Sequence, residues 1–230
     1  MRNLYEESWR LYKHHTESFL DDLGYYRGFC KGYKSLEMFA GFGRLANRLC
    51  EEGVDLETIE LSAEFSSLIR LPQEKKHIGD VTQVVLPRRF ERIFAAYNSF
   101  CLLTEDRQLH AFFRNIASML ADDGLVSLSY YHPDFWGDAV ALDLMIDGTK
   151  VKYEPSFDLS DRKARRAVWQ DKYTFGDQVV HHEYPVRVFE SDEDLLPFLE
   201  ASNLRLIDKV LDFNSANVSE PGWVDYIISF

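Results

Sequence analysis

The sequence predicts an α/β fold built around a seven-stranded, mainly parallel β-sheet. Short apolar segments alternate with helical segments between residues 35 and 131, which is the pattern of parallel strands joined by helical crossovers. Two glycines, Gly41 and Gly43, lie where the first strand meets the first crossover helix. The 230 residues are 46% hydrophobic and 14% aromatic, which suits one packed domain spanning residues 1–230.

The expected elements follow in a regular order. Tyr5, Trp9 and Tyr12 have the spacing of one helical face, so residues 1–33 are expected to form an N-terminal helical lid. The five parallel strands are expected at residues 35–40, 56–61, 77–79, 90–97 and 125–131. Their helices are expected at residues 43–52, 63–71 and 106–120.

The pattern changes after Pro133. Polar and β-prone residues alternate at 150–153, 167–175 and 178–189, which indicates antiparallel strands. We therefore expect residues 137–190 to be an insertion over the active site, because ligands of such sheets bind at the carboxyl ends of the parallel strands. A helix over 191–202 and two strands at 204–212 and 223–230 complete the prediction.

Composition narrows the possible partners. The net charge of −12 disfavours binding to a nucleic acid backbone and suits a small-molecule substrate. No apolar run reaches the ~18 residues of a membrane span, and the polar start of the chain lacks a signal-peptide core. Three cysteines without a Cys-x-x-Cys spacing indicate reduced thiols, so we expect a cytoplasmic protein, as a monomer or homodimer.

Acidic residues follow three successive strands. Glu37 precedes the glycine turn, while Glu60 and Asp80 end the second and third strands. Glycines at a strand–helix turn let the backbone approach a ligand closely, and a carboxylate at the end of the second strand can bind both hydroxyls of a ribose. This edge is therefore expected to bind a nucleoside-containing cofactor.

These segments resemble the class I S-adenosylmethionine-dependent methyltransferases, which have a Rossmann-like fold. LEMFAGFGRLANRL resembles the first family motif, with Glu37 as its acid and Phe39 in place of the first glycine. ETIELSAEF and HIGDVTQVVLP resemble the next two, in which Glu60 would bind the ribose and Asp80 the adenine amino group. FERIFAAYNSF and LADDGLVSLSYYHP follow in family order. The resemblance implies S-adenosylmethionine as cofactor, in a site completed by the following residues: Tyr12, Ala40, Gly41, Gly43, Leu61, Val81 and Ala96.

The flanking segments are similar to those of small-molecule N-methyltransferases, including enzymes that act on amino sugars. YEESWRLYKHH resembles their N-terminal lid, and VVHHEYPVRVFESDEDLLPFLEAS resembles the strand and helix after their insertion. The resemblance implies that Tyr12 approaches the sulfonium and that Arg187 lies near the substrate. The expected substrate-binding set is Tyr5, Tyr12, Phe100, Tyr173 and Arg187.

Catalytic candidates come from the loops after the fourth and fifth strands. Tyr97 and Asn98 could orient an amine, while Tyr131 and His132 follow the fifth strand. His132 is the best candidate for a general base by its ordinary pKa. The helix residues His14 and His15 are expected at the surface.

Several alternatives remain open at this stage. An enzyme that cyclises the aminobutyrate arm of S-adenosylmethionine to azetidine-2-carboxylate would use the same fold, and so would a non-catalytic cofactor-binding protein. A dinucleotide site is disfavoured, because the glycine spacing and Asp80 match the methyltransferase pattern better. No metal site is expected, since adjacent His181 and His182 would point to opposite faces of a strand.

Overall fold

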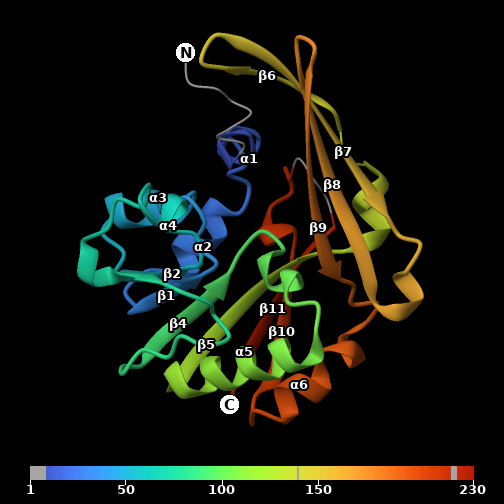
Figure 1. The fold of residues 1–230 in the computed structure, drawn as a ribbon. Coiled ribbons are helices and arrows are strands. Elements are labelled where there is room, and N and C mark those ends of the chain that lie inside the picture. Colours follow the sequence, from blue (N-terminus) through green and yellow to red (C-terminus); the bar gives the residue numbers. More distant parts are fainter. Residues whose placement is uncertain (1–8, 139, 219–221) are drawn as a thin grey trace.

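The computed structural model describes residues 9–138, 140–218 and 222–230 (Figure 1). Tyr5 lies outside the described residues. Within those ranges, no helix is long and apolar enough to cross a lipid bilayer.

The central sheet has seven strands in the order β10-β11-β5-β4-β1-β2-β3. Five neighbouring strands, β3, β2, β1, β4 and β5, are parallel, and β11 runs antiparallel to both β5 and β10. The strands are β1 (Ser35–Met38), β2 (Leu56–Glu60), β3 (Lys76–Ile78), β4 (Phe90–Ala95), β5 (Leu120–Tyr131), β10 (Arg205–Leu211) and β11 (Trp223–Ser229). This confirms the mainly parallel seven-stranded sheet expected from the sequence.

Both faces of this sheet are covered by helices, so its central strands are buried along their length. Every residue of β1 and of β2 is buried. The helices of this part are α2 (Leu23–Cys30), α3 (Ala46–Glu51), α4 (Ala63–Ser66), α5 (Asp106–Met119) and α6 (Leu196–Glu200). Short 3₁₀ helices occur at Gln73–Lys75, Ser99–Leu102, Pro133–Asp138, Arg162–Ala164, Asp192–Asp194 and Asp212–Asn214.

The longest helix, α5, shows why the sequence pattern was informative. Leu109, Phe112, Phe113 and Ile116 recur at helical spacing, and all four are buried. At its start, the Gln108 side chain accepts a hydrogen bond from the backbone N–H of Glu105 (3.0 Å), as part of a capping box. The predicted helix and the observed one agree to within one residue.

The insertion forms a separate antiparallel sheet in the order β6-β7-β8-β9. Its strands are β6 (Leu142–Ile146), β7 (Thr149–Asp158), β8 (Arg166–Phe175) and β9 (Gln178–Arg187). Figure 1 shows this sheet rising from the main body beside α1 (Trp9–Thr16), while α5, α6 and the C-terminus lie at the opposite end. Leu11 of α1 belongs to the apolar core of the insertion sheet.

Several elements differ from the sequence prediction: the helix expected over 63–71 ends at Ser66, and the strand expected over 125–131 begins at Leu120. The helix after β1 begins at Ala46, because Gly41 (φ +56°) and Gly43 (φ +81°) hold the preceding residues in turns. The helix expected over 191–202 is a 3₁₀ turn followed by α6, in agreement with Pro197 near its start. Strand β6 was not predicted; it is a short edge strand with only Ile146 buried.

Candidate active site

A cavity of about 800 Å³ opens at the carboxyl ends of β1, β2, β3 and β4. This is the edge at which ligands bind in α/β sheets, and the volume lies within the range of about 300–1,000 Å³ typical of ligand pockets. The main sheet contributes Phe39, Gly41, Glu60, Leu61, Asp80, Val81, Tyr97 and Asn98 to the lining. Helix α1 contributes Trp9, Tyr12 and His15, and the insertion contributes Trp169, Asp171, His182, Tyr184 and Val186.

The turn after β1 has an unusual backbone. Gly41 and Gly43 both have positive φ, and a Cβ built on Gly43 would lie 2.8 Å from Nδ2 of Asn47. Phe39 also has a positive φ of +58°. That conformation favours glycine, the usual residue at this position in the family motif that the segment resembles. Phe39 therefore occupies a strained position at the edge of the cavity.

Glu60 is held against the glycine turn. Its Oε2 accepts a hydrogen bond from the backbone N–H of Gly41 (2.7 Å), and its Oε1 accepts one from the N–H of Ser62 (2.9 Å). Only 8% of the residue is exposed, and it lines the cavity. The carboxylate is thus fixed in orientation beside the backbone that a ligand would approach.

Asp80 ends the neighbouring strand and is similarly constrained. It accepts hydrogen bonds from the backbone N–H and the hydroxyl of Thr82, both at 2.8 Å, and from the side chain of Gln83 at 3.1 Å. Partial burial raises the pKa of the Asp80 carboxyl, but these hydrogen bonds outweigh burial and hold it below its ordinary value. Asp80 is therefore an ionised acceptor on the cavity wall at neutral pH.

Glu37 lies in the protein interior and is not among the cavity-lining residues. Burial raises the pKa of its carboxyl to about 8, although the charge of Arg44 opposes this increase. Arg44 itself forms a buried ion pair with Asp22, with N–O distances of 2.6 and 2.7 Å. Within the part of the chain that the structure describes, Oε2 of Glu37 has no hydrogen-bond partner.

Tyr97 and Asn98 follow β4 and line the cavity, as expected for catalytic candidates. Both have positive φ, of +56° and +59°. Oδ1 of Asn98 accepts a hydrogen bond from the backbone N–H of Tyr131 (3.3 Å), which orients the amide group. Two consecutive residues in the left-handed region indicate a locally strained loop that the surrounding contacts hold in place.

Other expected site residues are placed elsewhere. Six expected site residues do not contribute to the cavity lining: Ala40, Gly43, Ala96, Phe100, Tyr131 and His132. The Tyr131 hydroxyl donates to the Phe135 carbonyl (3.1 Å), and His132 faces Asp134. Phe100 stacks on Phe189 in the core, with ring centroids 5.4 Å apart.

Tyr173 and Arg187 also lie outside the cavity lining. The hydroxyl of Tyr173 is hydrogen-bonded to Nδ1 of His15 (2.7 Å). The guanidinium of Arg187 donates to the Thr104 carbonyl (3.1 Å) and forms an ion pair with Asp106 at the start of α5. Arg187 thus links the insertion to the main sheet.

His15 corrects the expectation of a surface position. It is 9% exposed, stacks on Tyr153 with ring centroids 4.3 Å apart, and lines the cavity. Burial lowers the pKa of its imidazole to about 3, so the ring is neutral at neutral pH. Its burial arises because α1 packs on the insertion sheet, a contact that the helix pattern alone does not reveal.

Sequence reasoning missed Trp169 and Asp171 of β8. They lie two residues apart, so they share the face of the strand that also carries Tyr173. Asp171 is 1% exposed and accepts hydrogen bonds from the Tyr153 hydroxyl (2.8 Å) and from Nε1–H of Trp169 (3.1 Å). Residues 167–175 were expected to form a strand of the insertion over the active site. Every second side chain of such a strand lies on the same face, and this alternation could have identified Trp169 and Asp171 as residues that face the site.

The cavity has a strongly acidic character. Glu60, Asp80, Asp171 and Glu183 line it, and no Lys or Arg does so in the described part of the chain. Across residues 9–138, 140–218 and 222–230, no three His, Cys, Asp or Glu side chains converge as metal ligands. The negative charge of the four acidic side chains that line the cavity favours a cationic ligand.

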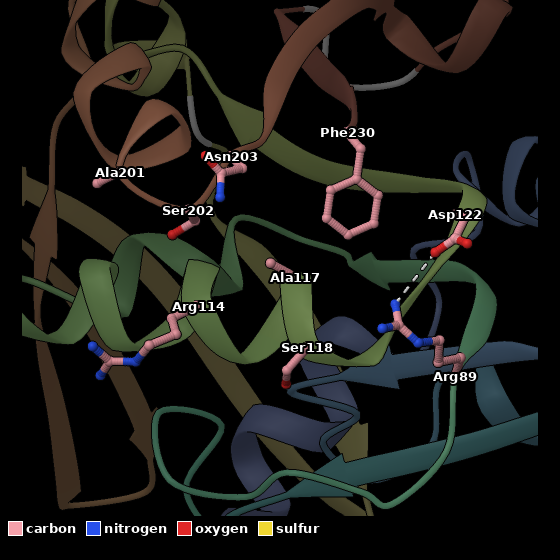
Figure 2. A pocket seen from close by; sticks show the side chains of 9 residues that line it. All are labelled: Arg89, Arg114, Ala117, Ser118, Asp122, Ala201, Ser202, Asn203 and Phe230. Atoms are coloured by element: carbon pink, nitrogen blue, oxygen red, sulfur yellow. Dashed lines mark ion pairs between the residues drawn. The ribbon is translucent and has the colours of Figure 1, made fainter.

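A second cavity, of about 670 Å³, lies at the other end of the sheet. Figure 2 shows it between α5, the residues after α6 and the C-terminal Phe230, with Arg89 facing Asp122 at 3.7 Å. Arg89 and Asp122 lie at the amino ends of β4 and β5. This is the edge opposite the one where α/β sheets bind their ligands, so the first cavity is the candidate active site.

Comparison with known proteins identifies the fold. Neither protein-family models nor curated proteins give a match to the chain. Among solved structures, an S-adenosylmethionine-dependent methyltransferase from Clostridium acetobutylicum matches with a TM-score of 0.74 and 15% identity, covering 99% of each chain.

Two further matches have narrower descriptions. A sugar N-methyltransferase from Streptoalloteichus has a TM-score of 0.75 at 18% identity, covering 95% of this chain and 91% of that one. An amino pentose methyltransferase from Micromonospora echinaspora, solved with bound S-adenosylmethionine, has a TM-score of 0.70 at 16% identity, covering 99% and 97%. The strand order, the insertion and these matches together show that the chain has the fold of the class I S-adenosylmethionine-dependent methyltransferases.

Proposed function

We propose that this chain is an S-adenosylmethionine-dependent enzyme that methylates an amine nitrogen of a small molecule. The observation that carries the proposal is the acidic cavity at the carboxyl ends of β1–β4, with Glu60 and Asp80 on its main-sheet side. The solved structures with this fold include enzymes described as sugar and amino pentose methyltransferases. An amine is favoured as acceptor because the cavity lining carries acids and no Lys or Arg within the described residues.

The residues present fit the cofactor. Glu60 would accept hydrogen bonds from the ribose hydroxyls, and Asp80 would accept one from the adenine amino group. Gly41 lines the cavity, and a Cβ built there would meet no atom within 4 Å, so its backbone is open to a ligand. When bound, S-adenosylmethionine supplies an electrophilic methyl group on a sulfonium.

The chain's own part in such a reaction is mainly positioning. Tyr97 and Asn98 line the cavity on a loop whose backbone is held in the left-handed region, and Asn98 is further oriented through Tyr131. Holding two reactants in line can lower a barrier by about 7–11 kcal/mol in favourable cases. Tyr12 and Trp9 from α1 add aromatic rings to the wall, which favour a cation by roughly 0.5–2 kcal/mol per well-placed ring.

The position of Tyr12 in the cavity wall supports a role for α1 as a lid. Burial raises the pKa of its hydroxyl to about 12, with Arg44 opposing and Asp171 and Glu60 adding to the increase. The hydroxyl is therefore protonated and can donate a hydrogen bond inside the cavity. We include Tyr12 in the proposed cofactor and substrate site on this basis.

The test uses calorimetry and mass spectrometry. S-adenosylmethionine and S-adenosylhomocysteine are expected to bind with affinities in the micromolar range, about −8 kcal/mol. Incubation of the enzyme and S-adenosylmethionine with a panel of small amines should yield S-adenosylhomocysteine and a methylated amine in equal amounts. Absence of binding by both cofactor forms would refute the proposal.

The same incubation without an acceptor separates the main alternative. Accumulation of methylthioadenosine in the absence of any amine would indicate cyclisation of the aminobutyrate arm. An unchanged cofactor under those conditions is the result expected for a methyltransferase.

A further inference from the structure

Asp171 is a buried carboxylate on the insertion side of the cavity. It belongs to β8 and is 1% exposed, yet it contributes to the cavity lining. Its charge and that of Glu60 both act on Tyr12, so Tyr12 lies near both acids. The cavity thus has one acid at the end of β2 and another on the insertion sheet.

Neutral groups surround this carboxylate. Its Oδ1 accepts hydrogen bonds from the hydroxyl of Tyr153 (2.8 Å) and from Nε1–H of Trp169 (3.1 Å). In the described part of the chain, no Lys, Arg or His side chain pairs with it. A carboxylate has about four acceptor sites, so two donors, both on Oδ1, leave room for a ligand's donor.

A buried anion without a cationic partner is costly unless something else compensates its charge. Burial raises the pKa of the Asp171 carboxyl above its ordinary value, although the hydrogen bonds from Tyr153 and Trp169 oppose this increase. These donors fix the carboxylate in place but do not neutralise it. A cationic ligand can supply the positive charge that compensates this carboxylate.

We propose that Asp171, flanked by Trp169 and Tyr184, binds the ammonium group of the acceptor. The carboxylate supplies the counter-charge, and the aromatic residues beside it favour a cation as well. The acceptor class is therefore an amine that is protonated in water, in preference to an alcohol, a carboxylic acid or a phosphate. Its nitrogen becomes nucleophilic only after a proton has left. This inference rests on the function proposed above.

The experiment compares amines with neutral molecules of the same shape. The enzyme is first saturated with S-adenosylhomocysteine. It is then titrated with three pairs: cyclohexylamine and cyclohexanol, benzylamine and benzyl alcohol, and methyl 3-amino-3-deoxyglucoside and methyl glucoside. Because Trp169 lines the cavity, binding can be followed by tryptophan fluorescence. We expect the amine to bind at least about tenfold more tightly than its alcohol in one or more pairs.

Variants assign this preference to Asp171. Asp171→Asn keeps the shape and removes the charge, so the amine and the alcohol should then bind within about threefold of each other. Asp177→Asn, in the exposed turn between β8 and β9, is the matched control and should keep the wild-type preference. Both variants should bind S-adenosylhomocysteine as the wild type does.

Two results would overturn the inference. One is a wild-type enzyme that binds the cofactor but prefers the amine in none of the three pairs, a comparison that does not depend on how any variant folds. The other is an Asp171→Asn variant that binds the cofactor and retains the wild-type amine preference, or one that retains this preference while losing tenfold or more in cofactor affinity, which would assign Asp171 to the cofactor. Failure of the wild type to bind S-adenosylhomocysteine would instead refute the proposed function.

Discussion

Replacing Asp225 with Asn is expected to change how the stability of the protein depends on pH. Asp225 lies in β11 with its side chain fully buried. Its Oδ1 accepts hydrogen bonds from the hydroxyls of Tyr26 (2.7 Å) and Ser127 (3.1 Å), while Oδ2 has no hydrogen-bond partner among the described residues. Burial raises the pKa of the carboxyl from 3.8 to about 7, against these two hydrogen bonds.

The sign and size follow from linkage between protonation and folding. Because the folded-state pKa is raised, the contribution of Asp225 is fully present below pH 4 and is lost as the pH rises through 7. The pKa difference corresponds to about 4 kcal/mol in total, of which about 2–3 kcal/mol falls between pH 5 and pH 8. The Asn variant carries no titrating group there, so the free energy of unfolding of the wild type should fall relative to the variant by that amount.

The assay is urea unfolding followed by circular dichroism at several pH values between 5 and 8. Comparing two proteins at each pH cancels the other titrating groups and any fixed cost of the new amide. Asp123→Asn is the control, because Asp123 is exposed to solvent. A wild-type-minus-variant difference that stays constant within about 0.5 kcal/mol across this range would contradict the assignment of a buried, neutral Asp225.

Three further variants test other parts of the structure. Glu60→Gln should weaken S-adenosylhomocysteine binding roughly 10- to 100-fold in calorimetry, since a charge-assisted hydrogen bond contributes about 1.5–3 kcal/mol. The control Glu64→Gln, at an exposed position, should leave S-adenosylhomocysteine binding unchanged. Gly43→Ala should destabilise the fold by at least about 1 kcal/mol more than Gly53→Ala. Both glycines have a positive φ, but only a Cβ at position 43 would clash with a side chain, that of Asn47. Equal losses of unfolding free energy for the two variants in urea would contradict this clash. Wild type should lose about 2 kcal/mol of stability relative to His15→Phe between pH 7 and pH 5, because the pKa of the buried imidazole is lowered to about 3. A pH-independent difference would show that His15 is solvated.

The sequence predicted what depends on short-range pattern. The strands β1, β2 and β4 are short, mostly buried segments that alternate with helices, so their existence and parallel order could be inferred from that alternation. Glu60 and Asp80 could be placed at the same edge because both directly end parallel strands. This is why their presence on the cavity wall was predictable.

Residues whose environment depends on distant segments could not be placed. His15 is buried by Tyr153 and Tyr173, which lie more than a hundred residues further along the chain. Arg187 was expected near the substrate but pairs with Asp106, because β9 ends beside the start of α5. Neither contact has a local signal in the sequence, and both depend on how the insertion sheet meets the main body.

Helix α1 shares more with the insertion than with the sheet that it precedes. Leu11 is buried with Ile146 and Val151 of the insertion, and Arg10 forms an ion pair with Asp147. For protein engineering, this makes α1 and β6–β9 one transplantable module encoded by two separate stretches of the gene. A chimaera that exchanged β6–β9 alone would leave Leu11 facing a foreign surface, whereas exchanging both stretches together would carry an intact core into the recipient.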